Sequence, residues 1–165
     1  SSLSDLSKWM MADYGLWNNV TRSELEQILS KVELRPGAKE LIDYLHRNGC
    51  YVVLITQGVD VLADLVAKKL GIKHVIVTRF KYNLREEAIG VDAVLSANDK
   101  GLALKKIANE LGVSMEKTVA VGDGSFDKDM FKVAGLAVGT NCKASLEPHV
   151  DYIVDDLLEI VPILS

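Results

Sequence analysis

The sequence has few cysteines, no long apolar run and no recognisable export signal. Its two cysteines, Cys50 and Cys142, lie far apart and lack metal-type spacing, which favours free, reduced thiols in a cytoplasmic protein over a disulfide or zinc framework. No apolar run approaches the roughly 20 residues that a membrane helix needs, and the N-terminus lacks the basic-then-apolar pattern of a signal peptide. We therefore predict a cytoplasmic protein with no membrane partner.

The sequence also lacks an excess of positive charge. A formal net charge of −4 and a pI near 5.4 provide no basic stripe that could follow a nucleic acid backbone, so no nucleic acid partner is expected. Hydrophobic residues make up 48% of the chain and charged residues 25%, which is typical of a globular protein. At 165 residues the chain suits one globular unit with a sizeable core, and it contains no internal repeat or linker.

The apolar patterns alternate between helical and strand spacing along most of the chain. Two helices are expected first, over residues 3–14 and after the capping-box sequence Thr21-Arg22-Ser23-Glu24. A helix opened by Pro36-Gly37 follows. The later predicted elements are strand 51–55, helix 59–70, strand 74–78, a hairpin over 80–95 with its turn at 85–87, helix 100–111, strands 118–121, 136–138 and 152–154, and a last helix from Asp155-Asp156, where Asp156 and Glu159 have capping-box spacing. Alternation of this kind predicts an α/β fold with a doubly wound, mostly parallel, Rossmann-like sheet.

Two carboxylates follow the strand predicted at residues 118–121. Asp123 comes directly after Gly122, and Asp127 lies four residues later, where a helical pattern begins. Ligands bind at the carboxyl ends of strands in parallel sheets, and Mg²⁺ is usually held by one or two carboxylates together with substrate phosphate oxygens. The spacing therefore predicts a Mg²⁺ site at Asp123 and Asp127.

An anion site is predicted where strand 51–55 meets the next helix. The hydroxyl of Thr56 and the amides of Gln57 and Gly58 lie where a helix N-terminus can hold an anion. Lys100 begins a later helix, where its charge is unfavourable against the helix dipole. That position indicates an anionic group nearby.

In these motifs the chain resembles the haloacid dehalogenase-like hydrolases, which are mostly Mg²⁺-dependent aspartyl phosphatases. The segment from Gly122 to Asp127 resembles the family's fourth motif, G-D-G/D-x-x-D. Thr56 matches the second motif, a hydroxyl that binds phosphoryl oxygens, and Lys100 matches the third, a cation that offsets phosphoryl charge. The resemblance implies that Thr56 and Lys100 are catalytic and that Asp123 and Asp127 hold the metal.

Two further segments resemble the phosphoserine phosphatase branch of that family. They are the hairpin before Asn98-Asp99-Lys100-Gly101 and the loop from Gly139 to Ala144. In that loop Asn141 is expected to help position the phosphoryl group, or else to act only as a turn former. Residues 1–33 are expected to form a small helical cap segment, residues 34–165 the α/β core, and the hairpin a flap.

The family's first motif, an apolar strand ending in D-x-D/E-G-T that carries the nucleophile, has no counterpart in the sequence. The resemblance implies that this strand lies between strands 51–55 and 118–121. Without it, two apolar strands would face a gap lined by unpaired backbone groups. We expect a strand of roughly 5–6 residues there, encoded upstream of Ser1.

The expected function is Mg²⁺-dependent hydrolysis of a small phosphorylated metabolite, phosphoserine-like or larger, through an aspartyl phosphate. The alternative is an inactive relative, a phosphate- or Mg²⁺-binding module with a regulatory or partner-binding role. A receiver-like or nucleotide-binding α/β domain shares the topology class and is the third hypothesis. The sequence does not indicate an oligomeric state.

Overall fold

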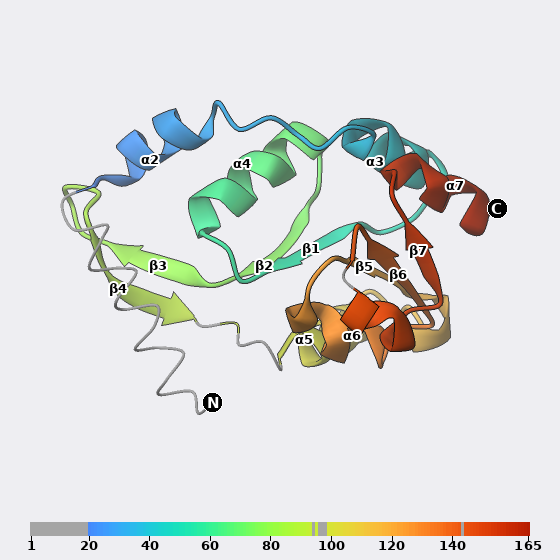
Figure 1. The fold of residues 1–165 in the computed structure, drawn as a ribbon. Helices are drawn as coiled ribbons and strands as arrows, with labels where there is room; N and C mark the ends of the chain where they lie inside the picture. Colours follow the sequence, from blue (N-terminus) through green and yellow to red (C-terminus); the bar gives the residue numbers. More distant parts are fainter. Residues whose placement is uncertain (1–19, 94, 96–98, 143) are drawn as a thin grey trace.

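The computed structural model describes residues 20–93, 95, 99–142 and 144–165 (Figure 1). The helix predicted over residues 3–14 lies outside this part of the chain. The elements are α2 (Arg22–Leu29), α3 (Ala38–Arg47), β1 (Val53–Thr56), α4 (Asp60–Leu70), β2 (His74–Val77), β3 (Arg79–Tyr82), β4 (Ala88–Ala93), α5 (Lys100–Glu110), the 3₁₀ turn η2 (Met115–Lys117), β5 (Val119–Gly122), η3 (Ser125–Asp127), α6 (Lys128–Phe131), β6 (Leu136–Thr140), η4 (Ala144–His149), β7 (Tyr152–Val154), η5 (Leu157–Glu159) and α7 (Ile160–Ile163).

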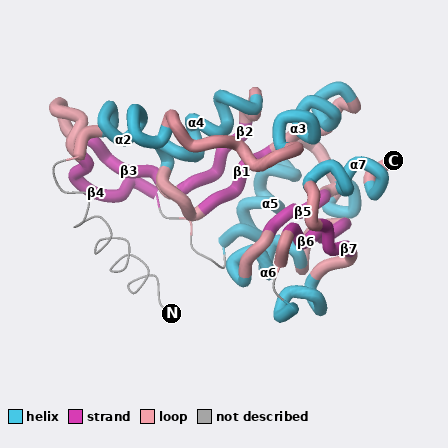
Figure 2. Tube along the Cα trace, turned by 45° about the horizontal axis from the view of Figure 1, so that its top comes forward, coloured by secondary structure: helices cyan, strands magenta, loops and turns pink. Residues whose placement is uncertain are grey.

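The parallel strands form two separate groups. Strand β1 pairs in parallel with β2, and β5, β6 and β7 form a second parallel sheet in that order. Figure 2 shows the two groups as distinct sets of magenta strands. In the described part of the chain β1 has no hydrogen-bonded neighbour besides β2, and β5 has none besides β6. A strand position is therefore open on the free edge of each sheet.

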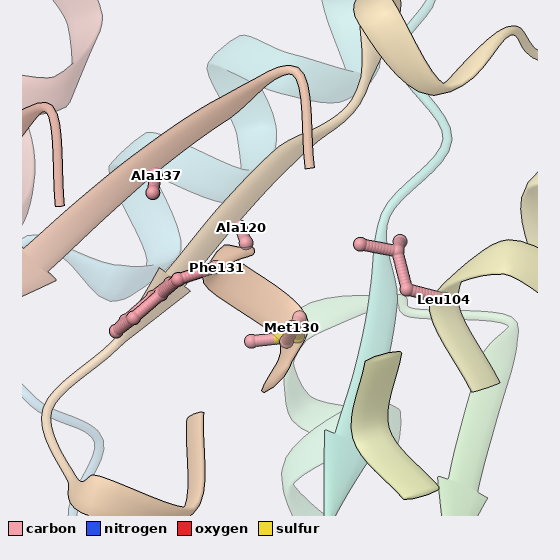
Figure 3. Packing of buried hydrophobic residues seen from close by; sticks show 5 residues of the cluster. All are labelled: Leu104, Ala120, Met130, Phe131 and Ala137. Carbon is pink, nitrogen blue, oxygen red and sulfur yellow. The ribbon is translucent and has the colours of Figure 1, made fainter. Parts of the chain in front are cut away.

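Helices cover the strands in two layers (Figure 1). On one side Leu104 of α5 and Met130 and Phe131 of α6 pack against Ala120 of β5 (Figure 3). Ile55 of β1 packs against this same cluster, so both parallel sheets rest on one helical layer. On the other side a second cluster joins α3, β6, β7 and α7 through Leu41, Val138, Val154 and Ile160. These two layers confirm the doubly wound α/β fold.

The β3–β4 hairpin leaves the parallel strands and extends to the end of the molecule away from β5, β6 and β7 (Figures 1 and 2). Helix α2 packs on α4, and its start bonds to the hairpin turn through the Arg22 amide and the Glu86 carbonyl, 2.9 Å apart. The hairpin was predicted from its strand pattern and is confirmed. No helix among the described residues is long and apolar enough to cross a membrane.

Several predicted boundaries shift. Pro36 does not begin a helix, because α3 begins at Ala38. Between them Gly37 is the N-cap with a φ of 77°, a left-handed conformation that separates Pro36 from the helical backbone. Strand β1 begins at Val53 rather than at Tyr51. It is only half-buried, although a strand buried on both faces was expected, because one of its edges is unpaired.

Of the two capping boxes predicted from the sequence, the first forms and the second does not. Thr21 and Glu24 form the predicted capping box. At the last helical segment Asp156 caps η5 through the Leu158 amide, but the Glu159 carboxylate accepts from the Asp155 amide instead of closing a box with Asp156.

Candidate active site

The carboxyl ends of β1 and β5 carry most of the residues that the sequence singled out. Thr56 is the last residue of β1, and Asp123 follows Gly122, the last residue of β5. Lys100 begins α5, which contacts both β1 and η3. The structure therefore places the second and fourth motifs at the carboxyl ends of β1 and β5, and the third at the start of α5.

The loop after β1 is held by the threonine side chain. The Gly58 amide donates to Thr56 Oγ1 at 3.1 Å, and the side-chain amide of Gln57 donates to the Leu95 carbonyl at 3.2 Å. Helix α4 begins two residues after Gly58. A helix N-terminus directly behind a tight loop presents backbone donors to an anion, so this geometry suits phosphoryl oxygens.

The loop after β5 is organised by Asp127. Its Oδ2 accepts from the amides of Asp123 and Gly124 at 3.1 and 3.0 Å, and its Oδ1 accepts from Lys100 Nζ at 2.6 Å. Asp127 is 6% exposed and Lys100 9% exposed, so the ion pair is buried. Asp127 lies in the 3₁₀ turn η3 rather than in the predicted α-helix. Its carboxylate thus fixes the loop that carries Asp123.

Close approach at this loop requires a glycine at position 122. A Cβ built there would lie 2.5 Å from Asp127 Cγ, a distance that real Cβ atoms do not show. At Gly124, by contrast, the nearest atom would be 3.8 Å away. The glycine before Asp123 is therefore needed for the Asp127 carboxylate to reach the loop amides.

The carboxylate of Asp123 is exposed at the strand end. Within the described residues no protein group donates a hydrogen bond to it, in contrast to the fully occupied carboxylate of Asp127. No group of three or more metal-ligating side chains gathers in the part of the chain that the structure describes. An oxygen-only site with one free carboxylate fits Mg²⁺, which keeps several waters and takes substrate oxygens as ligands.

Asn141 lies one strand further along, in the loop after β6. Its backbone has a φ of 46°, its amide donates to the Val154 carbonyl at 3.1 Å, and its side chain contacts Arg35 and Asp155. The described contacts therefore place the Asn141 side chain beside Arg35 rather than beside Thr56.

A polar network that was not predicted from the sequence lies behind the loop that follows β1. Asp60, 1% exposed at the start of α4, accepts from the Phe80 amide at 3.2 Å and from the Tyr82 hydroxyl at 3.1 Å. One turn later Asp64 accepts from Arg79 at 2.7 and 2.8 Å and from Arg22 at 3.3 Å. Burial and the neighbouring Asp60 carboxylate raise the pKa of the Tyr82 hydroxyl.

These hydrogen bonds connect the β3–β4 hairpin and α2 to α4, the helix that follows the loop after β1. The only sequence signal for it is the spacing of Asp60 and Asp64, which puts both carboxylates on one helical face. Their partners come from distant segments, so the pairing could not be read from the sequence.

A hollow of about 400 Å³ lies between β2 and α5, lined by residues that include Lys73, His74 and Lys106. Lys73 and His74 are at the amino end of β2, opposite the edge that carries Thr56. The hollow is therefore separate from the candidate active site.

Comparison with known proteins gives a family and several relatives that this chain resembles. Residues 6–132 match the family described as haloacid dehalogenase-like hydrolase. The chain is 33% identical to the phosphoserine phosphatase of Methanocaldococcus jannaschii over 141 residues, which cover 84% of this chain and 67% of that protein. It is 31% identical to the phosphoserine phosphatase of Idiomarina loihiensis over 151 residues, or 88% of this chain and 68% of that protein.

Solved structures that resemble this chain include phosphoserine phosphatases. A phosphoserine phosphatase in apo form superposes with a TM-score of 0.87 at 29% identity, covering 98% of this chain and 82% of the other. A phospho-aspartyl intermediate analogue of a phosphoserine phosphatase superposes with a TM-score of 0.85 at 30% identity, covering 96% and 78%.

Proposed function

This chain is a phosphatase that belongs to the haloacid dehalogenase-like hydrolases, and from that premise we propose that it hydrolyses a small phosphomonoester through an aspartyl phosphate, with Mg²⁺ as cofactor. The support for the proposal is that the Thr56 loop follows the carboxyl end of β1, while the free Asp123 carboxylate and the buried Lys100–Asp127 pair lie at the loop after β5.

The Thr56 loop and Lys100 bind the transferring phosphoryl group. Thr56 Oγ1 accepts from the Gly58 amide, which leaves the hydroxyl hydrogen free to donate to a phosphoryl oxygen. The Lys100 ammonium has three donors, and the described contacts use one of them on Asp127. A buried cation that is already oriented stabilises charge on the phosphoryl oxygens without a reorganisation step.

Asp123 holds the Mg²⁺ ion, and Asp127 keeps the Asp123 loop in place. The free carboxylate on an oxygen-lined strand end fits this hard cation, as argued above. When bound, Mg²⁺ supplies positive charge that offsets the charge of the phosphoryl group. The Asp127 contribution is to hold the backbone of residues 123 and 124 through two hydrogen bonds.

The nucleophile in this proposal is a carboxylate on a further parallel strand between β1 and β5. Among the described residues β1 pairs only with β2, and β5 only with β6, and free strand edges favour pairing with a further strand. A strand that ran parallel to both would end between Thr56 and Asp123. A carboxylate there attacks phosphorus and forms the acyl phosphate as the P–O ester bond breaks, and the ester oxygen takes up a proton from water and leaves as the alcohol. Water then cleaves the acyl phosphate to orthophosphate and regenerates the carboxylate.

The substrate that we propose is a small phosphorylated metabolite of the phosphoserine type. Support comes from the relatives, which are phosphoserine phosphatases at 31–33% identity. A substrate-bound structure of a phosphoserine phosphatase superposes with a TM-score of 0.86 at 30% identity.

The test is turnover of p-nitrophenyl phosphate and O-phospho-L-serine with Mg²⁺ and with EDTA, in the natural protein and in three variants. We expect EDTA to stop turnover, and Thr56→Val and Asp123→Asn each to lower kcat/KM about 100-fold or more. The matched control is Asp129→Asn, which removes a carboxylate that pairs with Lys132 at 2.9 Å on the protein surface. Turnover that survives both EDTA and Asp123→Asn would refute the metal role. Absence of turnover under all conditions would favour a non-catalytic binding module.

A further inference from the structure

The Thr56 loop, residues 56–59, is hydrogen-bonded near its start to the base of the β3–β4 hairpin. The side-chain amide of Gln57 donates to the Leu95 carbonyl at 3.2 Å, and Leu95 follows β4, where the chain leaves the hairpin. The Leu95 amide in turn donates to Thr78 Oγ1 at 3.0 Å, where the chain enters the hairpin. Leu95 and Thr78 are both buried. Gln57 is therefore bonded to a backbone position that is itself held in place.

The end of the same loop is hydrogen-bonded to strand β3. Asp60 is the first residue of α4 and is 1% exposed. Its Oδ2 accepts from the Phe80 amide at 3.2 Å, and its Oδ1 accepts from the Tyr82 hydroxyl at 3.1 Å and from the Val61 amide at 2.8 Å. A buried carboxylate is costly unless it is hydrogen-bonded. These contacts therefore fix the start of α4 against β3.

These hydrogen bonds determine where the loop amides point. A backbone site holds an oxyanion only when its N–H groups face one position, and donors that are already oriented need no rearrangement when charge develops. The bond from the Gly58 amide to Thr56 Oγ1 lies within the loop, so it cannot set the position of the loop relative to its neighbours. The contacts of Gln57 and Asp60 with the hairpin set that position.

We propose that the β3–β4 hairpin fixes the geometry of the phosphoryl-binding loop, and that the side chains of Gln57 and Asp60 are the positioning groups through which it does so. The inference rests on the proposed phosphatase function, in which this loop binds the phosphoryl group. Neither side chain contacts the substrate in this role. Thr78 and Tyr82, which lie outside the loop, then affect phosphoryl binding through Leu95 and Asp60.

The experiment measures affinity for inorganic phosphate by calorimetry, and kcat and KM for p-nitrophenyl phosphate, in each case with Mg²⁺. The variants Gln57→Leu, Thr78→Val and Tyr82→Phe each remove one of these hydrogen bonds. We expect each variant to weaken phosphate affinity about 3- to 10-fold, the equivalent of one net hydrogen bond. Gln57→Leu and Thr78→Val together should weaken it by less than the product of the two single effects, because both act through Leu95. Thr78→Ser, which keeps the hydroxyl, should stay within about twofold of the natural protein.

Two matched controls separate positioning from a general loss of stability. Thr118→Val is the control for Thr78→Val, because Thr118 is also buried and its Oγ1 accepts from the Gly135 amide at 3.2 Å, but it lies at the amino end of β5. Tyr44→Phe, which removes a hydroxyl from α3, is the control for Tyr82→Phe. Urea unfolding is measured for every variant. We expect Thr118→Val to lower the free energy of unfolding, and both controls to keep phosphate affinity within about twofold.

Two results would overturn the proposal while leaving the phosphatase function intact. One is that Thr78→Val and Tyr82→Phe lower the free energy of unfolding but leave phosphate affinity and KM unchanged, which would indicate a structural role only. The other is unchanged phosphate affinity in Gln57→Leu. If the natural protein neither binds inorganic phosphate nor hydrolyses p-nitrophenyl phosphate, the proposed function fails, and the role of the hairpin fails with it.

Discussion

Removal of one partner from the Lys100–Asp127 pair tests how the site is held together. The two charged atoms are 2.6 Å apart and both side chains are about nine-tenths buried. At an effective dielectric constant of about 20, their attraction is about 6 kcal/mol before the cost of desolvation. Breaking a buried pair from one side usually costs about 3–5 kcal/mol, because the other charge is left buried and unpaired.

We therefore expect Asp127→Asn to lower the free energy of unfolding by about 3–5 kcal/mol, which corresponds to a fall in Tm of about 10 °C in a chain of this size. Lys100→Met leaves the Asp127 carboxylate with its two amide donors, so we expect a smaller loss of about 3 kcal/mol. The double variant should lose about 2 kcal/mol less than the sum of the two single losses, because it leaves no unpaired charge.

The assay is urea unfolding of all four proteins at one pH, with the free energies combined in a double-mutant cycle. The matched control is the exposed pair of Lys39 and Asp43, 2.8 Å apart on α3, for which the same cycle should show little coupling. Additive losses at Lys100 and Asp127 would contradict this coupling, since they would mean that the pair does not act as a unit.

Further predictions concern the two loops and the hairpin. Gly122→Ala should displace the Asp127 carboxylate, lower the free energy of unfolding by about 1–3 kcal/mol and abolish phosphatase activity. Gly124→Ala should be tolerated, because a Cβ there has open space around it. Unfolding and activity assays on both variants check this. Because the pKa of Tyr82 is raised, the folded state resists its ionisation, so stability is fully present below about pH 10 and falls as pH rises above that value. Tyr82→Phe should lose part of this alkaline dependence, and hydrogen exchange at the Phe80 amide should quicken; an unchanged pH profile would contradict the raised pKa.

The local patterns in the sequence predicted most of the core. The capping box at Thr21 and Glu24 and the apolar runs of the strands each depend on neighbouring residues, so they could be predicted directly. The error at Pro36 has a physical cause: the chain enters α3 through the left-handed conformation of Gly37, which packs against Asp156 and Leu158 more than a hundred residues later.

The sequence predicted the residues of the candidate site but not the hydrogen bonds between them. Thr56 and Asp123 follow the strand patterns at the carboxyl ends of β1 and β5, and Lys100 begins α5, as the sequence predicted. The sequence did not indicate that Lys100 bonds to Asp127, or that Arg35 lies over Thr140. These contacts join segments 27 and 105 residues apart, and such pairings depend on the tertiary structure.

The proposed phosphoryl transfer passes through an aspartyl phosphate on a strand between β1 and β5. To test this step, the natural protein is mixed with ³²P-labelled substrate and Mg²⁺ and quenched with acid within milliseconds, and label on the denatured protein is measured. We expect acid-stable label that hydroxylamine removes, as an acyl phosphate requires, and that is absent with EDTA. Turnover with no labelled protein, or label that resists hydroxylamine, would contradict it.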